Sequence, residues 1–185
     1  MERSTIFAGF GGQGILFAGT ALARAAMAEG LEVLWIPSYG PEMRGGTASC
    51  TVIVASETIG SPIVDKADAV VALNPPSMAK FEGVVAPGGL LVLNASLIEA
   101  EPKRTDIEVV ALPGTALARA AGDDRLVSVV ALGALIARRP IVSLDSTRAA
   151  ISAIVSAKHP EFLAADLAAL EAGFAAALEG VAVPG

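Results

Sequence analysis

The sequence predicts a three-layer α/β fold, in which helices cover both faces of a mostly parallel sheet of about six strands. Short apolar runs of strand length alternate with longer segments whose apolar residues recur every three or four positions. Several of the short runs are apolar on successive residues, as in strands that are buried on both faces. The first run is followed by a glycine-rich turn and a long helical pattern, an order typical of Rossmann-like folds.

Six segments have the composition and length of strands. They are residues 4–8, 31–36, 51–55, 69–73, 90–93 and 107–112. The first two strands and the helix between them have the length of a βαβ unit, roughly 30 residues, with a right-handed crossover. We expect the chain to turn out of the fourth strand at Pro75 and Pro76, because proline donates no hydrogen bond to a sheet.

Five segments have helical patterns. They are residues 15–26, 115–121, 126–137, a segment from 146 onward, and 160–180. The third is apolar nearly all round, which predicts a central buried helix. Asp145 and Pro160 are expected to begin the last two helices, as an N-cap and as a first-turn residue. These C-terminal helices, within residues 145–180, would complete a single domain that spans residues 1–185, since this length suits one well-buried core.

The composition excludes some classes of function. A formal net charge of −6 argues against nucleic-acid binding, which depends on lysine and arginine side chains that neutralise phosphates. The apolar runs are at most about a dozen residues long, whereas a membrane span needs about 20. No secretory signal is recognised at the start, which predicts a cytoplasmic location. Low charge content, 17%, suggests that part of the surface is buried against partner subunits and leaves homodimerisation open.

Few residues could carry chemistry. With one cysteine, Cys50, and one histidine, His159, the chain can form neither an internal disulfide nor an intrinsic iron–sulfur cluster or conventional zinc site. We interpret Cys50 as a small buried residue and His159 as an exposed residue near a helix start. The Asp123-Asp124 pair is better explained by helix capping than by acid–base catalysis. The sequence therefore predicts no catalytic residue and no metal ligand in this chain.

The first glycine-rich turn has a specific physical use. Gly9, Gly11 and Gly14 match the pattern G-x-G-x-x-G between a strand and a helix, where a loop without β-carbons can approach a diphosphate and helix amides point at its charge. A nicotinamide or flavin site is less well supported, because the second strand ends at residues 34–37 without the acid that would bind a ribose. The alternative is that the glycines serve only close packing of the helix on the sheet.

A second unusual segment, residues 38–50, separates two strand-like runs. Gly40-Pro41 and Gly45-Gly46 predict a loop there. Its side chains with recognition groups are Ser38, Tyr39, Glu42 and Arg44. Because it leaves the carboxyl end of a strand beside the glycine turn, we interpret it as one wall of a composite site rather than a solvated connection. Asn74, at the end of another strand, could reach the same crevice.

Two motifs together carry a family resemblance. The run Gly9-Phe10-Gly11-Gly12-Gln13-Gly14, followed about 25 residues later by Ser38-Tyr39-Gly40-Pro41-Glu42-Met43-Arg44-Gly45-Gly46-Thr47, resembles the gamma subunit of 2-oxoacid:ferredoxin oxidoreductases of the 2-oxoglutarate, branched-chain or pyruvate type. Further similar segments, at 61–64 and 132–134, extend the resemblance to about Arg139. One departure is Ser128, which stands where an asparagine is expected.

The resemblance implies a heteromeric enzyme that oxidatively decarboxylates a 2-oxoacid to an acyl-CoA and passes the electrons to ferredoxin. Thiamine diphosphate, Mg and [4Fe-4S] clusters would then lie in partner subunits, and this chain alone would hold no cofactor and be inactive. The implied partners are the alpha and beta subunits, with a ferredoxin-like delta subunit as a further candidate. The part implied for this chain is to bind coenzyme A, as a co-substrate, and to close the active site from one side.

Carried over residue by residue, the resemblance assigns coenzyme A contacts to Gly9, Gly11, Gly12, Gln13, Gly14, Ser38, Arg44, Gly45, Gly46 and Thr47. Arg44 is the expected contact for a phosphate or carboxylate. The missing acid after the second strand fits coenzyme A, whose 3′-phosphate a carboxylate would repel. Two alternatives stay open: a structural or assembly subunit without ligand contact, and a free-standing dinucleotide-binding protein.

Overall fold

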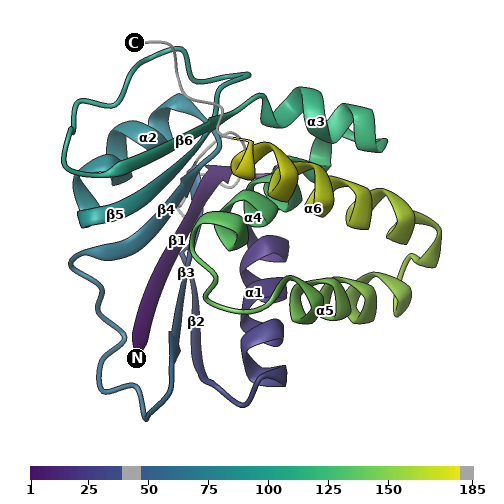
Figure 1. Ribbon diagram of the computed structural model, residues 1–185, viewed down its shortest axis with the longest axis horizontal. Helices are drawn as coiled ribbons and strands as arrows, with labels where there is room; N and C mark the ends of the chain where they lie inside the picture. Colours follow the sequence, from purple (N-terminus) through teal and green to yellow (C-terminus); the bar gives the residue numbers. More distant parts are fainter. Residues whose placement is uncertain (39–46, 180–185) are drawn as a thin grey trace.

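The computed structural model describes residues 1–38 and 47–179. Within these residues, six strands form one sheet in the order β2-β3-β1-β4-β5-β6 (Figure 1). The strands are β1 (Glu2–Phe10), β2 (Glu32–Ser38), β3 (Thr47–Ala55), β4 (Ala67–Ala72), β5 (Val85–Asn94) and β6 (Glu108–Leu112). Residues 39–46 and 180–185 lie outside the described part, and they include the predicted loop residues Tyr39, Gly40, Pro41, Glu42, Arg44, Gly45 and Gly46 and the predicted helix end at Gly180.

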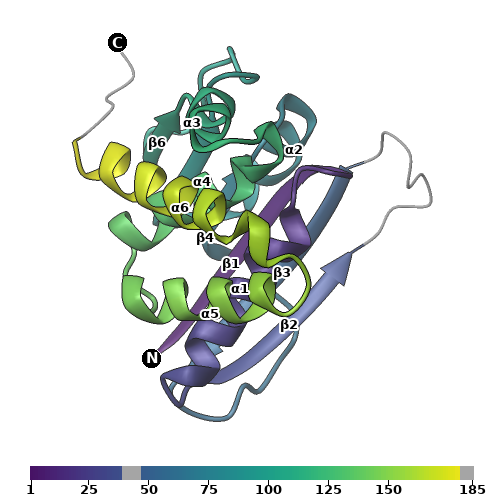
Figure 2. The same ribbon diagram turned by 90° about the vertical axis from the view of Figure 1, so that its right-hand side faces the viewer.

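Helices cover the two faces of the sheet unequally. The helices are α1 (Ile15–Ala28), α2 (Pro75–Phe81), α3 (Gly114–Ala121), α4 (Val127–Arg138), α5 (Leu144–Ser156) and α6 (Leu163–Leu178). Short 3-10 turns are η1 (Glu82–Val84), η2 (Asp124–Leu126) and η3 (Pro160–Phe162). Of the helices in the described residues, α2 packs on one face and the other five lie on the opposite face (Figures 1 and 2). The predicted α/β fold is confirmed.

The sheet is mostly parallel, as predicted, with one reversed strand. β4 pairs in parallel with β1 and β5, and β5 pairs in parallel with β6. β3 runs antiparallel to both β1 and β2, so that it lies between the two strands of the βαβ unit. β3 is reversed because it follows β2 directly in the chain and pairs with it as the second strand of a hairpin. β1 and β2 therefore point the same way without touching.

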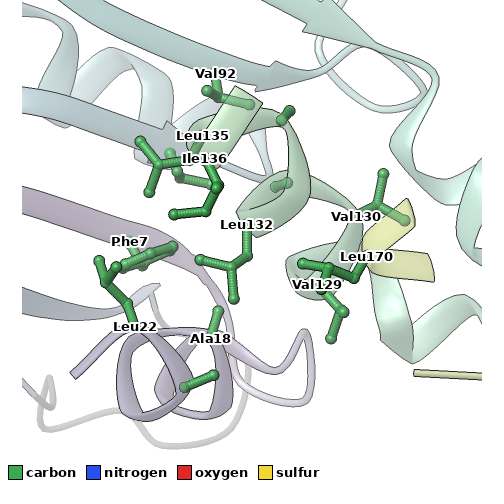
Figure 3. Packing of buried hydrophobic residues seen from close by; sticks show 14 of the residues in the cluster. Phe7, Ala18, Leu22, Val92, Val129, Val130, Leu132, Leu135, Ile136 and Leu170 are labelled. Carbon is green, nitrogen blue, oxygen red and sulfur yellow. The ribbon is translucent and has the colours of Figure 1, made fainter. Parts of the chain in front are cut away.

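The apolar runs of the strands face two separate cores. In β4, Val71 belongs to the core under the five helices, whereas the neighbouring Val70 belongs to the core under α2. This alternation explains why the strand is apolar on successive residues. Helix α4 is buried at every position from Val127 to Ile136, which confirms the predicted central helix. Figure 3 shows its Leu132 directed toward Ala18 and Leu22 of α1.

Helix α2 was not predicted from the sequence. The predicted exit from the fourth strand at the two prolines is confirmed, since β4 ends at Ala72, but this exit leads into a helix, with Asn74 as its N-cap and Pro75 and Pro76 as its first residues. The Asn74 Oδ1 accepts a hydrogen bond from Ser77 N at 2.9 Å. Proline is well tolerated there, since the first N–H groups of a helix have no helical acceptor.

The predicted start of α5 also needs correction. Ser143, not Asp145, is the N-cap, and its hydroxyl accepts a hydrogen bond from Ser146 N at 3.0 Å. Asp145 lies in the first turn and pairs with Arg148. Pro160 begins the short turn η3, which leads directly into α6. Residues of α5 and α6 join the same core as α1 and α4.

Two glycines set how closely α4 and α6 approach. A β-carbon on Gly173 would overlap the carbonyl group of Val130, and one on Gly133 would overlap the Leu170 carbonyl and lie 2.8 Å from Phe174 N. The backbones of the two helices are therefore in direct contact where they cross. No side chain larger than hydrogen fits at either position without separating the helices.

Gly173→Ala is expected to lower the free energy of unfolding by about 3 kcal/mol, the upper end of the usual cost of overpacking. The matched control is Gly83→Ala, because no atom of the described chain lies within 4 Å of the β-carbon position there. The control should change the free energy of unfolding by less than about 0.5 kcal/mol. Urea denaturation followed by circular dichroism measures both, and equal midpoints would contradict the packing argument.

Candidate functional site

The carboxyl ends of several strands meet at one edge of the sheet. β1, β4, β5 and β6 are parallel, so the segments that follow them all leave this edge. Helices α1, α2 and α3 begin there, after β1, β4 and β6 respectively. Open α/β sheets bind ligands in the crevice outside these strand ends.

The described ends of the predicted loop lie at the same edge. Thr47, the first residue of β3, is paired with Phe10 at the end of β1, and Ser38 is paired with Ser49. The connection between Ser38 and Thr47 therefore starts and ends beside the glycine turn, as predicted. Arg44, Gly45 and Gly46 lie outside the described residues.

The glycines of the turn have different structural roles. Gly12 has φ = +94°, and no described atom lies within 4 Å of its β-carbon position. Glycine is therefore favoured there by the left-handed backbone and not by close packing. A β-carbon on Gly9 would lie 2.7 Å from Gln13 Oε1 and 2.8 Å from Ile15 Cδ1. Gly14, with φ = +75°, is the N-cap of α1 and faces Ser128 Oγ. Close packing thus explains Gly9 and Gly14, while Gly11 and Gly12 are exposed at the tip.

The side chain of Gln13 binds to the protein itself. Its Oε1 accepts hydrogen bonds from Phe10 N at 2.7 Å and from Asn74 Nδ2 at 3.3 Å. Its Nε2 donates to Leu73 O at 3.5 Å. The prediction that Asn74 reaches the crevice of the glycine turn is confirmed by this contact.

Asn94 extends the same network and was missed by the sequence reasoning. Its Nδ2 donates to Leu73 O at 3.3 Å and to Thr115 Oγ1 at 3.1 Å. Its Oδ1 accepts from Thr115 N at 3.2 Å and from Ser96 N at 3.3 Å. The available signal was its position, since it ends an apolar strand just as Asn74 follows one. The half-buried Gln13 amide and the buried amides of Asn74 and Asn94 therefore link the ends of β1, β4 and β5 to the start of α3.

The start of α4 also reaches the glycine turn. A β-carbon on Gly14 would lie 3.4 Å from the carbonyl oxygen of Arg125. Ser128 is buried, and its Oγ has no hydrogen-bond partner within the described chain. The Arg125 guanidinium is 74% exposed and pairs with Asp123 at 2.6 Å, which holds the pKa of Asp123 down to about 2. No local pattern predicts a role for this arginine, because tertiary packing brings its segment to the turn.

Four residues to which the sequence assigns no chemistry are Asp123, Asp124, His159 and Cys50, and the structure agrees with that assignment. Asp123 accepts a hydrogen bond from Arg125 N at 2.8 Å and caps η2, so the predicted capping is confirmed for this residue. Asp124 pairs instead with Arg119 at 2.7 Å, a contact that was not predicted. The His159 side chain is 64% exposed, as predicted. Cys50 is fully buried, also as predicted, and burial raises the pKa of its thiol to about 12.

The described ranges, 1–38 and 47–179, lack two features. There, no three His, Cys, Asp or Glu side chains come together in a group that could hold a metal ion. None of the helices in these ranges combines the length and the apolar character needed to cross a membrane.

The sequence profile of the family described as "Pyruvate ferredoxin/flavodoxin oxidoreductase" matches residues 4–176. The chain belongs to this family. It is 40% identical over 168 residues to the ketoisovalerate oxidoreductase subunit VorA of Methanothermobacter marburgensis. The aligned residues cover 90% of this chain and 34% of VorA. It is 34% identical to the 2-oxoglutarate synthase subunit KorC of Methanocaldococcus jannaschii, over 82% of each chain. The chain thus spans about a third of the length of VorA and most of KorC.

Solved structures show the same fold. The gamma subunit of a keto/oxoacid ferredoxin oxidoreductase from Geobacter sulfurreducens PCA matches with a TM-score of 0.83 and 28% identity, over 96% of this chain and 99% of that one. The 2-oxoglutarate:ferredoxin oxidoreductase of Magnetococcus marinus, with 2-oxoglutarate, coenzyme A and succinyl-CoA bound, matches with a TM-score of 0.87 and 27% identity. That match covers 97% of this chain and 32% of the longer one. The predicted likeness to gamma subunits is confirmed.

The contact between Gly14 and Ser128 predicts a non-additive pair of substitutions. Gly14→Ala should destabilise the protein by both left-handed strain, about 1–2 kcal/mol, and overpacking, about 1–3 kcal/mol. Ser128→Ala removes the overlapping hydroxyl, so the double variant should regain most of the free energy of unfolding that overpacking removes. Gly12→Ala is the matched control, because it carries strain without overlap. Strictly additive changes in denaturation midpoint would contradict a direct contact.

Cys50 should be unreactive in the folded protein. Burial keeps the thiol protonated, whereas an unfolded cysteine has a pKa of about 8.5 and reacts as its thiolate. A thiol reagent at pH 8 should therefore modify Cys50 only after denaturant is added. Because the folded pKa is the higher one, the contribution of Cys50 to stability should fall as the pH rises above about 8.5. Rapid labelling without denaturant would contradict this placement.

Proposed function

We propose that this chain is the gamma-type subunit of a heteromeric 2-oxoacid:ferredoxin oxidoreductase and that its carboxyl edge binds coenzyme A. The observation that supports this most strongly is the convergence of the glycine turn, the start of α1 and both ends of the 39–46 connection at one strand edge. The coenzyme A bound to the Magnetococcus relative agrees with this function. The enzyme would convert a 2-oxoacid to an acyl-CoA and pass the electrons to ferredoxin.

The start of α1 suits a diphosphate. Its N-cap, Gly14, offers no side-chain acceptor, and the first turn contains no acid, so the first N–H groups can meet an external anion. The exposed tip, Gly11 and Gly12, allows the ligand to approach the backbone. Gln13 would act as a positioning residue, since its side chain already binds Phe10 and Asn74.

Two arginines would supply positive charge. Arg44, with Gly45, Gly46, Ser38 and Thr47 around it, is the proposed contact for a phosphate or carboxylate. Arg125 is a second candidate, because its segment touches Gly14 and its guanidinium is largely exposed. A charged side chain there would orient coenzyme A rather than react with it. The same edge would close the active site of a partner subunit from one side.

The redox cofactors are proposed to lie in other chains. Cys50 is buried, and its Sγ donates to Ile15 O at 3.5 Å, so it is unsuited to bind a cluster. Thiamine diphosphate, Mg and [4Fe-4S] would belong to the alpha and beta subunits and to a ferredoxin-like delta subunit. We further propose that residues 1–185 form one domain. Homodimerisation and a cytoplasmic location stay predictions.

Arg44→Ala should raise the KM for coenzyme A by about tenfold or more, as expected for the loss of a charge-assisted hydrogen bond worth about 1.5–3 kcal/mol. The KM for the 2-oxoacid and the iron–sulfur content of the purified complex should not change. Arg125→Ala should act in the same direction. The matched control is Arg24→Ala, which changes an exposed arginine at the tenth position of α1.

The same variants test the two alternatives. An assembly subunit without ligand contact would lose partner subunits on size-exclusion chromatography while the KM for coenzyme A stayed the same. A free-standing dinucleotide-binding protein would bind NAD or FAD tightly as an isolated chain. An unchanged KM in an intact complex would contradict the proposed contact.

A further inference from the structure

A pocket lies at the opposite edge of the sheet from the glycine turn. Its volume is about 300 Å³, and it lies where β1, β4 and β5 begin and α4 ends. The residues that line it include Arg3, Asp68, Pro87, Arg139 and Ile141. This edge is the one where the chain start is marked in Figure 1.

An irregularity in β5 forms one wall of the pocket. Ala67 pairs with Val85, but two residues later Ala69 pairs with Leu90, so residues 86–89 leave the regular ladder. Gly88 has φ = +72°, and a β-carbon on Gly89 would lie 2.9 Å from Asp68 O. The fold therefore holds this segment in a specific shape through two glycines, as bulges that orient a site commonly do.

The pocket contains more positive than negative charge. Arg3 pairs with Asp68 at 2.9 Å, and Glu108 is shared between Arg138 and Arg139, with a distance of 2.7 Å to Arg139. Among the charged side chains that line the pocket, two arginines, Arg3 and Arg139, meet one carboxylate, Asp68, while Arg138 and Glu108 lie outside the lining. A small anion would balance this excess.

Both arginines that line the pocket can bind a ligand without leaving a buried partner unpaired. Asp68 Oδ2 accepts from Ser4 N at 2.9 Å and from Ser4 Oγ at 3.2 Å, so Asp68 keeps partners when Arg3 turns away. Arg3 is 53% exposed. Arg139 Nη2 donates to Gly88 O at 3.1 Å, which fixes the guanidinium at the bulge. One arginine is therefore fixed and the other adjustable, an arrangement suited to an oxyanion.

We propose that this pocket binds a small organic anion, with one carboxylate or phosphate group, through Arg3 and Arg139. Apolar lining atoms from Pro87 and Ile141 would contact a compact apolar body. The volume is at the lower end for ligand pockets, so it suits a compact ligand better than one as large as coenzyme A. The distance along β1 from Arg3 to Gly9 is about 20 Å, so the pocket and the glycine turn can be tested independently.

The test uses the full chain without an N-terminal tag, because Met1 also lines the pocket. Inorganic phosphate and isobutyrate are titrated separately at constant ionic strength, and binding is followed by calorimetry and by chemical shifts of residues 86–89. Saturable binding of either probe supports the proposal and shows which oxyanion is preferred. Absence of saturable binding by both probes overturns it.

Arg3→Gln should weaken binding by about tenfold, as the loss of a charge-assisted contact predicts, and Arg139→Gln should weaken it at least as much. The matched control is Arg119→Gln, which removes the same charge from another exposed ion pair, that with Asp124. Equal affinity of Arg3→Gln and Arg119→Gln would overturn the assignment. Arg3→Gln should leave the KM for coenzyme A unchanged, so failure here is separate from failure of the proposed function.

Discussion

The side-chain amide of Gln13 hydrogen-bonds the end of β1 to the end of β4, and the shape of the candidate site depends on it. Its Oε1 meets both Phe10 N and Asn74 Nδ2. Asn94 continues this network to the start of α3. Asn74 and Asn94 are buried, and an unpaired polar group in a buried place costs about 1–3 kcal/mol, so these amides stabilise one arrangement of the edge. The turn that follows β1 is thereby held in a fixed position relative to α2 and α3.

This network changes how the glycine pattern should be understood. Gly9 leaves room for the Gln13 amide, and Gly14 leaves room for Ser128 at the start of α4. Packing and ligand binding are therefore complementary uses of the same motif. Gly9 and Gly14 allow the close packing at the ends of α1 and α4. Gly11 and Gly12 form the exposed tip, which a ligand can approach.

Most of the architecture could be predicted from local patterns. Apolar runs located every strand, although β3 begins at Thr47, four residues before the predicted start, and β5 begins at Val85, five residues before the predicted start. Helix α2 was not predicted because two prolines after a strand are equally compatible with a loop and with the start of a helix. The cap of α5 was assigned to Asp145 because Ser143 and Asp145 are both good N-cap residues, and only the backbone conformation distinguishes them.

The sequence by itself determined the α/β class, the buried α4 and the two glycine-rich motifs, because each depends on the order of residues along a short segment. Only the tertiary structure decided that β3 separates β1 from β2, that Arg125 and Ser128 lie against Gly14, and which glycines pack. These features join segments that are far apart in the chain. Their positions follow from how the helices fit on the sheet, and local periodicity contains no information about that fit.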